Sequence, residues 1–356
     1  MTTNSHDASH LHAVNIVTGI PSAEGVSSIP ISDCQMRSQC GNSDDFSEWV
    51  QIRVIGIGRS GCQIVDRLYQ RKYEEQCVQL IAIDVNEASL YQCGADKHIH
   101  LAASVADREK YVAEIRVRVE QAKEAICSAM RRAHMLFIVG EASDSTGNAA
   151  APLIAKWASE MHIPNVGALI MPCKSDTDIG NELAYDTLNQ MRLIADSVIE
   201  VSADDVRKHL HRHATSACIS LEANALVSEA IRGVIDLVML PGYVCVDFAD
   251  VCSAFDEPDI GVIGIGFASG PDRAHLAAEQ AWSSPLMGGI QTSQINALIA
   301  IISVAPGTFR LSEGKTVMTT ILNKVSSETF FIYGARFNPS LGDRIQVTII
   351  ATGHTR

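Results

Sequence analysis

The sequence predicts an α/β fold with three ordered parts: a parallel-sheet domain, a long central helix and a smaller α+β domain. Over residues 49–215, short apolar runs alternate with segments of helical spacing, which is typical of a parallel sheet covered by helices on both faces. Over 216–240, apolar residues recur at steps of three and four and predict one helix. Over 241–356, the pattern changes to longer apolar runs, which indicate a second domain.

Each expected element has its own signal. The runs VQIRVIGIG, VQLIAID, HMLFIVG and NVGALIM predict four buried strands. Residues 107–132 predict a single long polar helix. In the last part, IGVIGIGFA and INALIAIISV predict strands. FFIYGARFN and RIQVTIIAT predict a terminal pair of strands separated by a turn at 338–343.

Residues 1–48 differ from the rest of the chain. They are rich in Ser, His, Asn and Asp, with two isolated apolar patches, AVNIVTGI and SSIPIS. This composition predicts a disordered arm, because it offers too little apolar surface to form a core. A partner-binding peptide is the alternative.

Composition restricts the function classes. Apolar residues make up 47% of the 356 residues and charged residues 19%, so the chain can fill a core. The net charge of −13 argues against nonspecific binding to nucleic acid or to an anionic membrane. Ten scattered cysteines without CxxC spacing, no signal peptide and no run of about 20 apolar residues predict a cytoplasmic protein that does not insert into a membrane.

A glycine motif follows the first predicted strand. Gly56, Gly58 and Gly61 form a GxGxxG pattern at a strand-to-helix junction, where free backbone N–H groups can bind a phosphate. Asp84 ends the next strand, near the position of the acid that binds ribose in dinucleotide folds. From this segment alone, an NAD-dependent oxidoreductase and a tight turn that only packs a helix on a strand both remain open.

Longer motifs in the second half decide between these readings. PGYVCVDFADV, GIGFASGPDRAHLAAEQAWSSPL and the ending IQVTIIATG resemble the bacterial cell-division protein FtsZ, in the same order and at similar spacing. FIVGEASDSTGNAAAP falls in register as well, so the resemblance covers about residues 50–354. It implies a Rossmann-like GTPase domain over 49–215, a central helix over 216–240 and a C-terminal α+β domain over 241–356.

The resemblance also implies assembly. Members of the family polymerise head to tail, and the loop after the central helix enters the nucleotide site of the neighbouring subunit. Asp247 and Asp250 match the two catalytic acids of that loop, and would act on the neighbour's nucleotide. A helix N-cap around Asp250 is the competing role for these acids. Cys245 replaces the family's asparagine in the same loop.

The expected pocket for GTP or GDP is altered, with Mg²⁺ as a candidate ion. The family's glycine run corresponds here to Gly58, Arg59, Ser60, Gly61, Cys62 and Gln63. Arg59 either binds a phosphate or is a surface residue. In the second phosphate loop, Ser145, Thr146 and Gly147 follow Asp144, whose charge would repel a polyphosphate. The family's γ-phosphate loop has no counterpart here.

The ribose and base contacts are reduced. Asp176 matches the ribose-binding acid, and Asn224 stands at a base-facing position of the central helix. Gly180 replaces the family's arginine, Ser220 its stacking aromatic and Ala225 its neighbouring acid. The peptide that binds membrane-tethering partners in the family is not found after the folded part.

These losses lead to a specific expectation. We expect an FtsZ-like cytoskeletal protein, at the division site, that associates head to tail with itself or with an authentic FtsZ. Its own GTP binding and hydrolysis are expected to be weak or lost. The alternative is an active polymerising GTPase of the division ring.

Overall fold

The computed structural model describes residues 50–73, 77–102, 108–210, 214–240, 242–256, 259–288 and 290–354. The predicted arm at 1–48 lies outside them. The strands form one mixed sheet of ten, in the order β3-β2-β1-β4-β5-β6-β7-β10-β8-β9. Their bounds are β1 (Ile52–Ile57), β2 (Val78–Asp84), β3 (Lys97–His100), β4 (Met135–Glu141), β5 (Asn165–Met171), β6 (Ser197–Ser202), β7 (Asp259–Ala268), β8 (Ile295–Val304), β9 (Phe330–Phe337) and β10 (Ile345–Gly353).

The first seven strands in this order are parallel, as the alternation of apolar runs and helices predicts. β1 and β5 are buried along their whole length because helices cover both faces of the sheet. The sheet continues into the C-terminal part through a short pairing of β6 with β7, where Ser197 to Ile199 face Asp259 to Gly261. One sheet therefore runs through both predicted domains.

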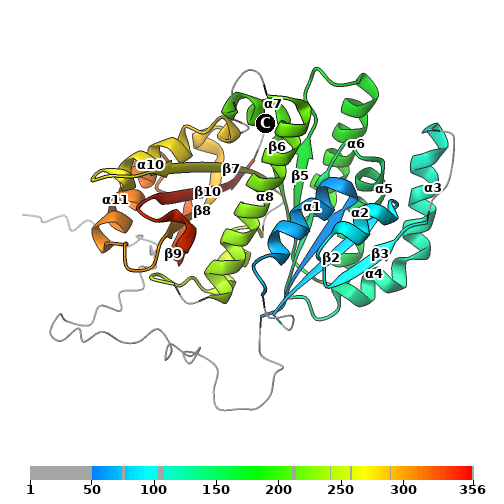
Figure 1. The fold of residues 1–356 in the computed structure, drawn as a ribbon, viewed down its shortest axis with the longest axis horizontal. Helices are drawn as coiled ribbons and strands as arrows, with labels where there is room; N and C mark the ends of the chain where they lie inside the picture. The colour runs from blue at the N-terminus through cyan, green and yellow to red at the C-terminus, as the bar shows by residue number, and fades with distance from the viewer. Residues whose placement is uncertain are drawn as a thin grey trace, which may run out of the picture. The chain divides into compact units, whose positions relative to one another are not determined.

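The helices lie on the two faces of this sheet (Figure 1). The parallel part carries α1 and α8 on one face and α3 to α6 on the other, while α10 and α11 cover the C-terminal strands. The bounds are α1 (Gly58–Tyr69), α2 (Glu87–Gln92), α3 (Arg108–Gln121), α4 (Lys123–Met130), α5 (Ser145–Glu160), α6 (Asp178–Ile194), α7 (Ala203–His209), α8 (Ser216–Met239), α9 (Phe248–Ser253), α10 (Arg273–Trp282) and α11 (Leu311–Leu322). In the described ranges, no helix is both long and apolar enough to cross a bilayer.

The predicted central helix is confirmed as α8. Its apolar residues at helical spacing are buried, and α8 packs against strands of both parts of the sheet. These buried residues are Ile219, Ala223, Leu226, Ala230, Val234 and Leu237.

Two expectations about elements are wrong. The helix predicted over 107–132 is two helices, α3 and α4, separated at Ala122, whose ψ of 1° is not helical. The predicted terminal pair is not a pair, because β9 and β10 lie on opposite sides of β8. β10 instead fills the gap between β7 and β8, where it runs antiparallel to both.

Candidate functional site

Helices begin at the carboxyl edge of the parallel strands. α1 follows β1, α2 follows β2, α5 follows β4, α6 follows β5 and α7 follows β6. Helix N-termini present free backbone N–H groups, so this edge is where an α/β sheet binds a phosphorylated ligand. The structure brings the predicted glycine loop and the predicted second phosphate loop together here.

The glycines of the first loop are explained by close packing. Gly58 has a φ of 68°, which a residue with a side chain rarely adopts. A Cβ atom on Gly61 would lie 2.6 Å from the carbonyl carbon of Gly56 and 2.7 Å from the backbone oxygen of Val139. Gly61 therefore lets α1 pack directly on β1 and β4, whether or not a ligand binds. Of the neighbouring residues, Cys62 is buried and Arg59 is exposed.

The second loop places a carboxylate against the first. A Cβ atom on Gly58 would lie 1.8 Å from Oδ2 of Asp144, so this carboxylate fills the space beside the Gly58 backbone. Behind it, Thr146 is buried, and a Cβ atom on Gly147 would lie 2.4 Å from the Glu141 backbone oxygen. Thr146 and Gly147 thus pack the start of α5 on β4.

Three carboxylates share this edge. Glu141 accepts hydrogen bonds from Ser60 Oγ at 3.1 Å and from Ser143 Oγ at 2.7 Å, which joins the two loops. Asp84 is only 3% exposed. Burial, followed by the charges of Asp84 and Glu141, raises the pKa of Asp144 to about 6. Negative charge is therefore concentrated at the edge where the two predicted phosphate loops meet.

Asn224 is buried and forms a contact within the chain. Its Nδ2 donates a hydrogen bond to Gln63 Oε1 at 2.7 Å, which joins α8 to α1. Its Oδ1 has no hydrogen-bond partner among the described residues. An amide oxygen of this kind can accept a hydrogen bond from a base, so Asn224 fits a nucleotide better than the phosphate end of the site does.

Asp176 lies between β5 and α6 and is exposed. Its Oδ2 accepts a hydrogen bond from the Cys173 backbone N–H at 2.9 Å, so the side chain is engaged in its own turn. The cap of α6 is formed by Thr177, whose hydroxyl accepts from the Gly180 N–H at 3.2 Å.

Asp247 and Asp250 lie at the opposite edge of the sheet. The segment that carries them is attached to β9 by backbone hydrogen bonds between Val244 and Ala335. Phe248 then contacts the ring of His134, just before β4, edge-on at 6.5 Å. The structure therefore separates these two acids from the glycine loop of the same chain.

Both acids are exposed to solvent. Asp247 is the N-cap of α9 and accepts a hydrogen bond from the Ala249 N–H at 3.2 Å. The N-cap of α9 is therefore Asp247 and not Asp250, which lies in the first turn of the helix.

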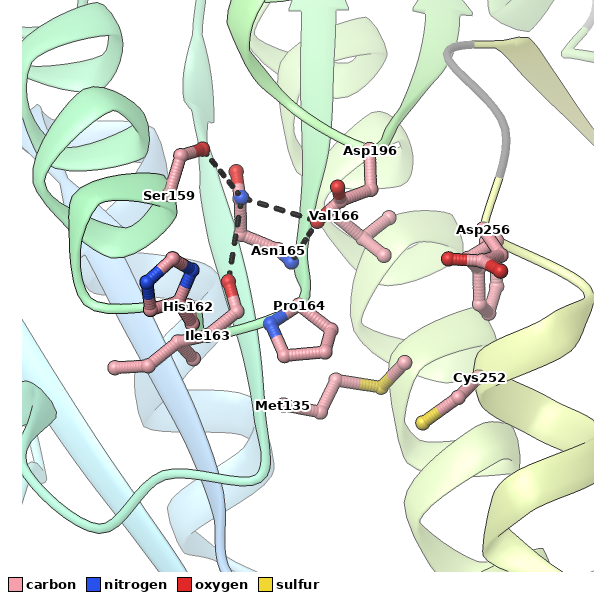
Figure 2. Close-up of a pocket in the computed structure, with 11 residues that line it drawn as sticks. Met135, Ser159, His162, Ile163, Pro164, Asn165, Val166, Asp196, Cys252 and Asp256 are labelled. Atoms are coloured by element: carbon pink, nitrogen blue, oxygen red, sulfur yellow. Dashed lines mark hydrogen bonds between the residues drawn. The ribbon is translucent and has the colours of Figure 1, made fainter.

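A pocket of about 250 Å³ lies beside α9 (Figure 2). Figure 2 shows Asn165 on one side, where its amide nitrogen donates to Ser159, Ile163 and Asp196, and Cys252 and Asp256 on the other. Sequence reasoning missed this pocket, because its residues come from four separate segments that carry no motif. It also missed the hydrogen bond from Ser60 to Glu141, because these two residues are 81 positions apart in the sequence.

Two protein-family models match separate parts of this chain. Residues 51–210 match the family model of the tubulin/FtsZ GTPase domain, and residues 260–355 match that of the FtsZ C-terminal domain. The chain is 30% identical over 312 residues to cell division protein FtsZ of Aquifex aeolicus, which covers 87% of this chain and 84% of the relative. The FtsZ of Mycoplasmopsis pulmonis is 30% identical over 314 residues, covering 87% and 79%.

Solved structures show the same fold. An empty FtsZ dimer of M. jannaschii superposes with a TM-score of 0.78 at 21% identity, covering 85% of this chain and 88% of that one. GDP-bound monomeric CetZ1 of Haloferax volcanii gives 0.71 at 16% identity, covering 86% and 95%.

Proposed function

Because this chain belongs to the tubulin/FtsZ family, we propose that it associates head to tail with another copy of itself or with an authentic FtsZ. The observation that carries the proposal is the position of Asp247 and Asp250. They are exposed at the edge of the sheet opposite to the glycine loop, so they can reach such a loop only in another subunit. Attachment of residues 243–244 to β9 holds this segment in place for docking.

The proposal includes weak or absent GTP binding by the chain's own pocket. Two unit charges about 4 Å apart repel by roughly 4 kcal/mol at an effective dielectric near 20. Asp144, beside Gly58, would impose a repulsion of this order on a polyphosphate. That corresponds to a loss of roughly a thousandfold in affinity. We place this protein in the cytoplasm, at the division site.

An active GTPase is the second candidate. It is favoured by the buried Thr146 and Gly147 at the start of α5 and by the free amide oxygen of Asn224. Under this reading, a cation would offset Asp144, and the same head-to-tail contact would complete each active site.

Two measurements separate the candidates. Calorimetry with GTP and magnesium, together with phosphate release, should show no binding below millimolar GTP and no turnover. Micromolar binding with turnover would instead establish the active GTPase. In parallel, the protein is mixed with the FtsZ of the same cell, and polymer is sedimented. Wild type should change the amount of polymer.

Asp250→Ala should remove this effect, whereas Asp178→Ala, an exposed acid at the carboxyl edge, should keep it. If neither self-association nor any effect on FtsZ is found, the docking proposal is wrong.

A further inference from the structure

We propose that Asp84 and Asp144 together bind one divalent cation of the Mg²⁺ class directly, in the absence of any nucleotide. Asp84 ends β2 and Asp144 follows β4, and these two strands flank β1. Their carboxyl ends therefore meet at the glycine loop. The inference does not depend on docking between subunits, since it concerns a site within one chain.

The first observation is an unpaired buried oxygen. Asp84 is 3% exposed, and its Oδ1 accepts a hydrogen bond from the Asn86 N–H at 3.2 Å. Its Oδ2 is buried and has no hydrogen-bond partner among the described residues. Native structures rarely leave a buried carboxylate oxygen in this state, because the lost hydration is not replaced. A bound cation would replace it.

The second observation is the neighbouring carboxylate. Asp144 stands at the N-cap position of α5, where the Thr146 backbone N–H also acts on its carboxylate. Its Oδ2 lies beside Gly58, where the lack of a side chain leaves room. After burial, the charge of Asp84 contributes most to raising the pKa of Asp144, in keeping with the strand order that brings both residues to the glycine loop.

The third observation is the lack of a compensating protein charge. Within the described residues, neither Asp84 nor Asp144 forms an ion pair with a lysine, arginine or histidine. Arg59 is a basic residue whose charge opposes the raised pKa of Asp144, but its side chain is exposed and its effect is smaller than those of burial, Asp84 and Glu141. The pair therefore carries negative charge that a soluble cation can neutralise.

The chemistry of the site selects the class of ion. Oxygen ligands suit Mg²⁺ and Mn²⁺, which are commonly bound by one or two carboxylates with water completing the coordination. Glu141 is engaged by hydrogen bonds from Ser60 and Ser143, and the proposed ligands are restricted to Asp84 and Asp144. No group of three or more side chains suited to holding a metal ion occurs in the part of the chain that the structure describes. One divalent ion would cancel the charge of the two carboxylates and make the edge compatible with a phosphate.

The test uses Mn²⁺ alone with the full-length protein, observed by electron paramagnetic resonance of the free ion. We expect saturable binding of one Mn²⁺ per chain at submillimolar concentration, with competition by Mg²⁺. Asp144→Asn should weaken binding by about tenfold or more, because it removes one of two charged ligands. Asp84→Asn should do the same, and circular dichroism checks that this buried variant is folded.

Asp176→Asn is the matched control, because Asp176 is an exposed acid at the same edge and should leave binding unchanged. Arg59→Ala should strengthen binding slightly by removing a nearby positive charge. Absence of saturable binding, or binding that Asp144→Asn leaves intact, overturns the inference. These outcomes do not test docking between subunits, because the docking experiment uses Asp250→Ala and Asp178→Ala and leaves Asp84 and Asp144 unchanged.

Discussion

Nη1 of Arg336 donates a hydrogen bond to Oδ2 of Asp236 at 2.5 Å, and this pair joins β9 to α8 inside the protein. The two side chains are 3% and 1% exposed. Arg336 also donates to Ser303 on β8 and pairs with Glu229 on α8. The other Asp236 oxygen accepts from the Tyr73 hydroxyl at 2.8 Å. Asp236 thus connects the central helix to the C-terminal strands and to the segment after α1.

Breaking this pair from one side should be costly. Arg336→Met removes the closer and more buried cation of Asp236 and leaves its carboxylate with the partly exposed Arg71, whose Nε lies 3.7 Å from Oδ1. A loss of about 3–5 kcal/mol in the free energy of unfolding is expected. The double variant Arg336→Met/Asp236→Leu should recover part of this loss, because it leaves no unpaired charge. Urea unfolding followed by circular dichroism measures both.

Arg344→Met is the control, since Arg344 is exposed and lies over the Phe267 ring at 6.0 Å. It should cost less than about 1 kcal/mol. Equal losses for Arg336→Met and Arg344→Met would show that the buried pair has no special role.

The parts of the fold that depend on local pattern could be predicted from the sequence. Continuous apolar runs identify β1, β4 and β5, and helical spacing identifies α8, because burial of these elements dictates their residues. The position of β10 could not be predicted. Its alternation of apolar and polar residues from Ile345 to Ile349 identifies a strand but not its neighbours, and only tertiary packing places it between β7 and β8.

The candidate site could likewise be predicted from the sequence only in part. Gly58 and Gly61 could be predicted as a phosphate loop because they follow a strand, whereas Thr146 could be assigned only through the resemblance to FtsZ. The meeting of Asp84 with Asp144 requires the strand order β2-β1-β4, which no local pattern encodes. For this reason Asp84 resembled a ribose-binding acid, whereas the structure buries it beside another carboxylate.

Gly61→Ala should destabilise the protein even without nucleotide. The added Cβ would meet backbone atoms of Gly56 and Val139 that cannot move independently of the sheet. Overpacking of this kind costs about 1–3 kcal/mol. Gly180→Ala is the matched control, because its Cβ would come no closer than 3.1 Å to a side-chain atom and alanine favours the helix. Thermal unfolding of both variants decides whether packing explains the glycine; no change in Gly61→Ala contradicts it.

Asp144 should lower the stability of the folded protein as the pH rises from about 4 to about 6. Burial, then Asp84, raises the pKa of Asp144 from 3.8 to about 6, so the folded state favours the protonated form. The stabilisation is complete below about pH 4 and is lost as the pH rises to about 6, for a total of about 3 kcal/mol. Asp144→Asn lacks this titration.

In metal-free buffer, Asp144→Asn should therefore be more stable than wild type at pH 7, and the difference should disappear near pH 4. Urea unfolding of both proteins at several pH values measures it. Taking the difference removes the other carboxyls that titrate in this range, such as Asp196, whose pKa burial also raises. A difference that does not vary with pH contradicts the assignment.

Head-to-tail association should be detectable with one introduced cysteine. Arg59 and Cys245 are both exposed, and they lie at opposite edges of the sheet, so they cannot react with each other within one chain. In a Cys218→Ser background, which removes another exposed thiol, Arg59→Cys should cross-link to Cys245 of the next subunit with a short bismaleimide. A denaturing gel should then show a ladder of oligomers, because each chain carries both reactive ends. Adding Cys245→Ser should abolish the ladder, whereas a product limited to dimers would indicate a symmetric contact in place of head-to-tail association.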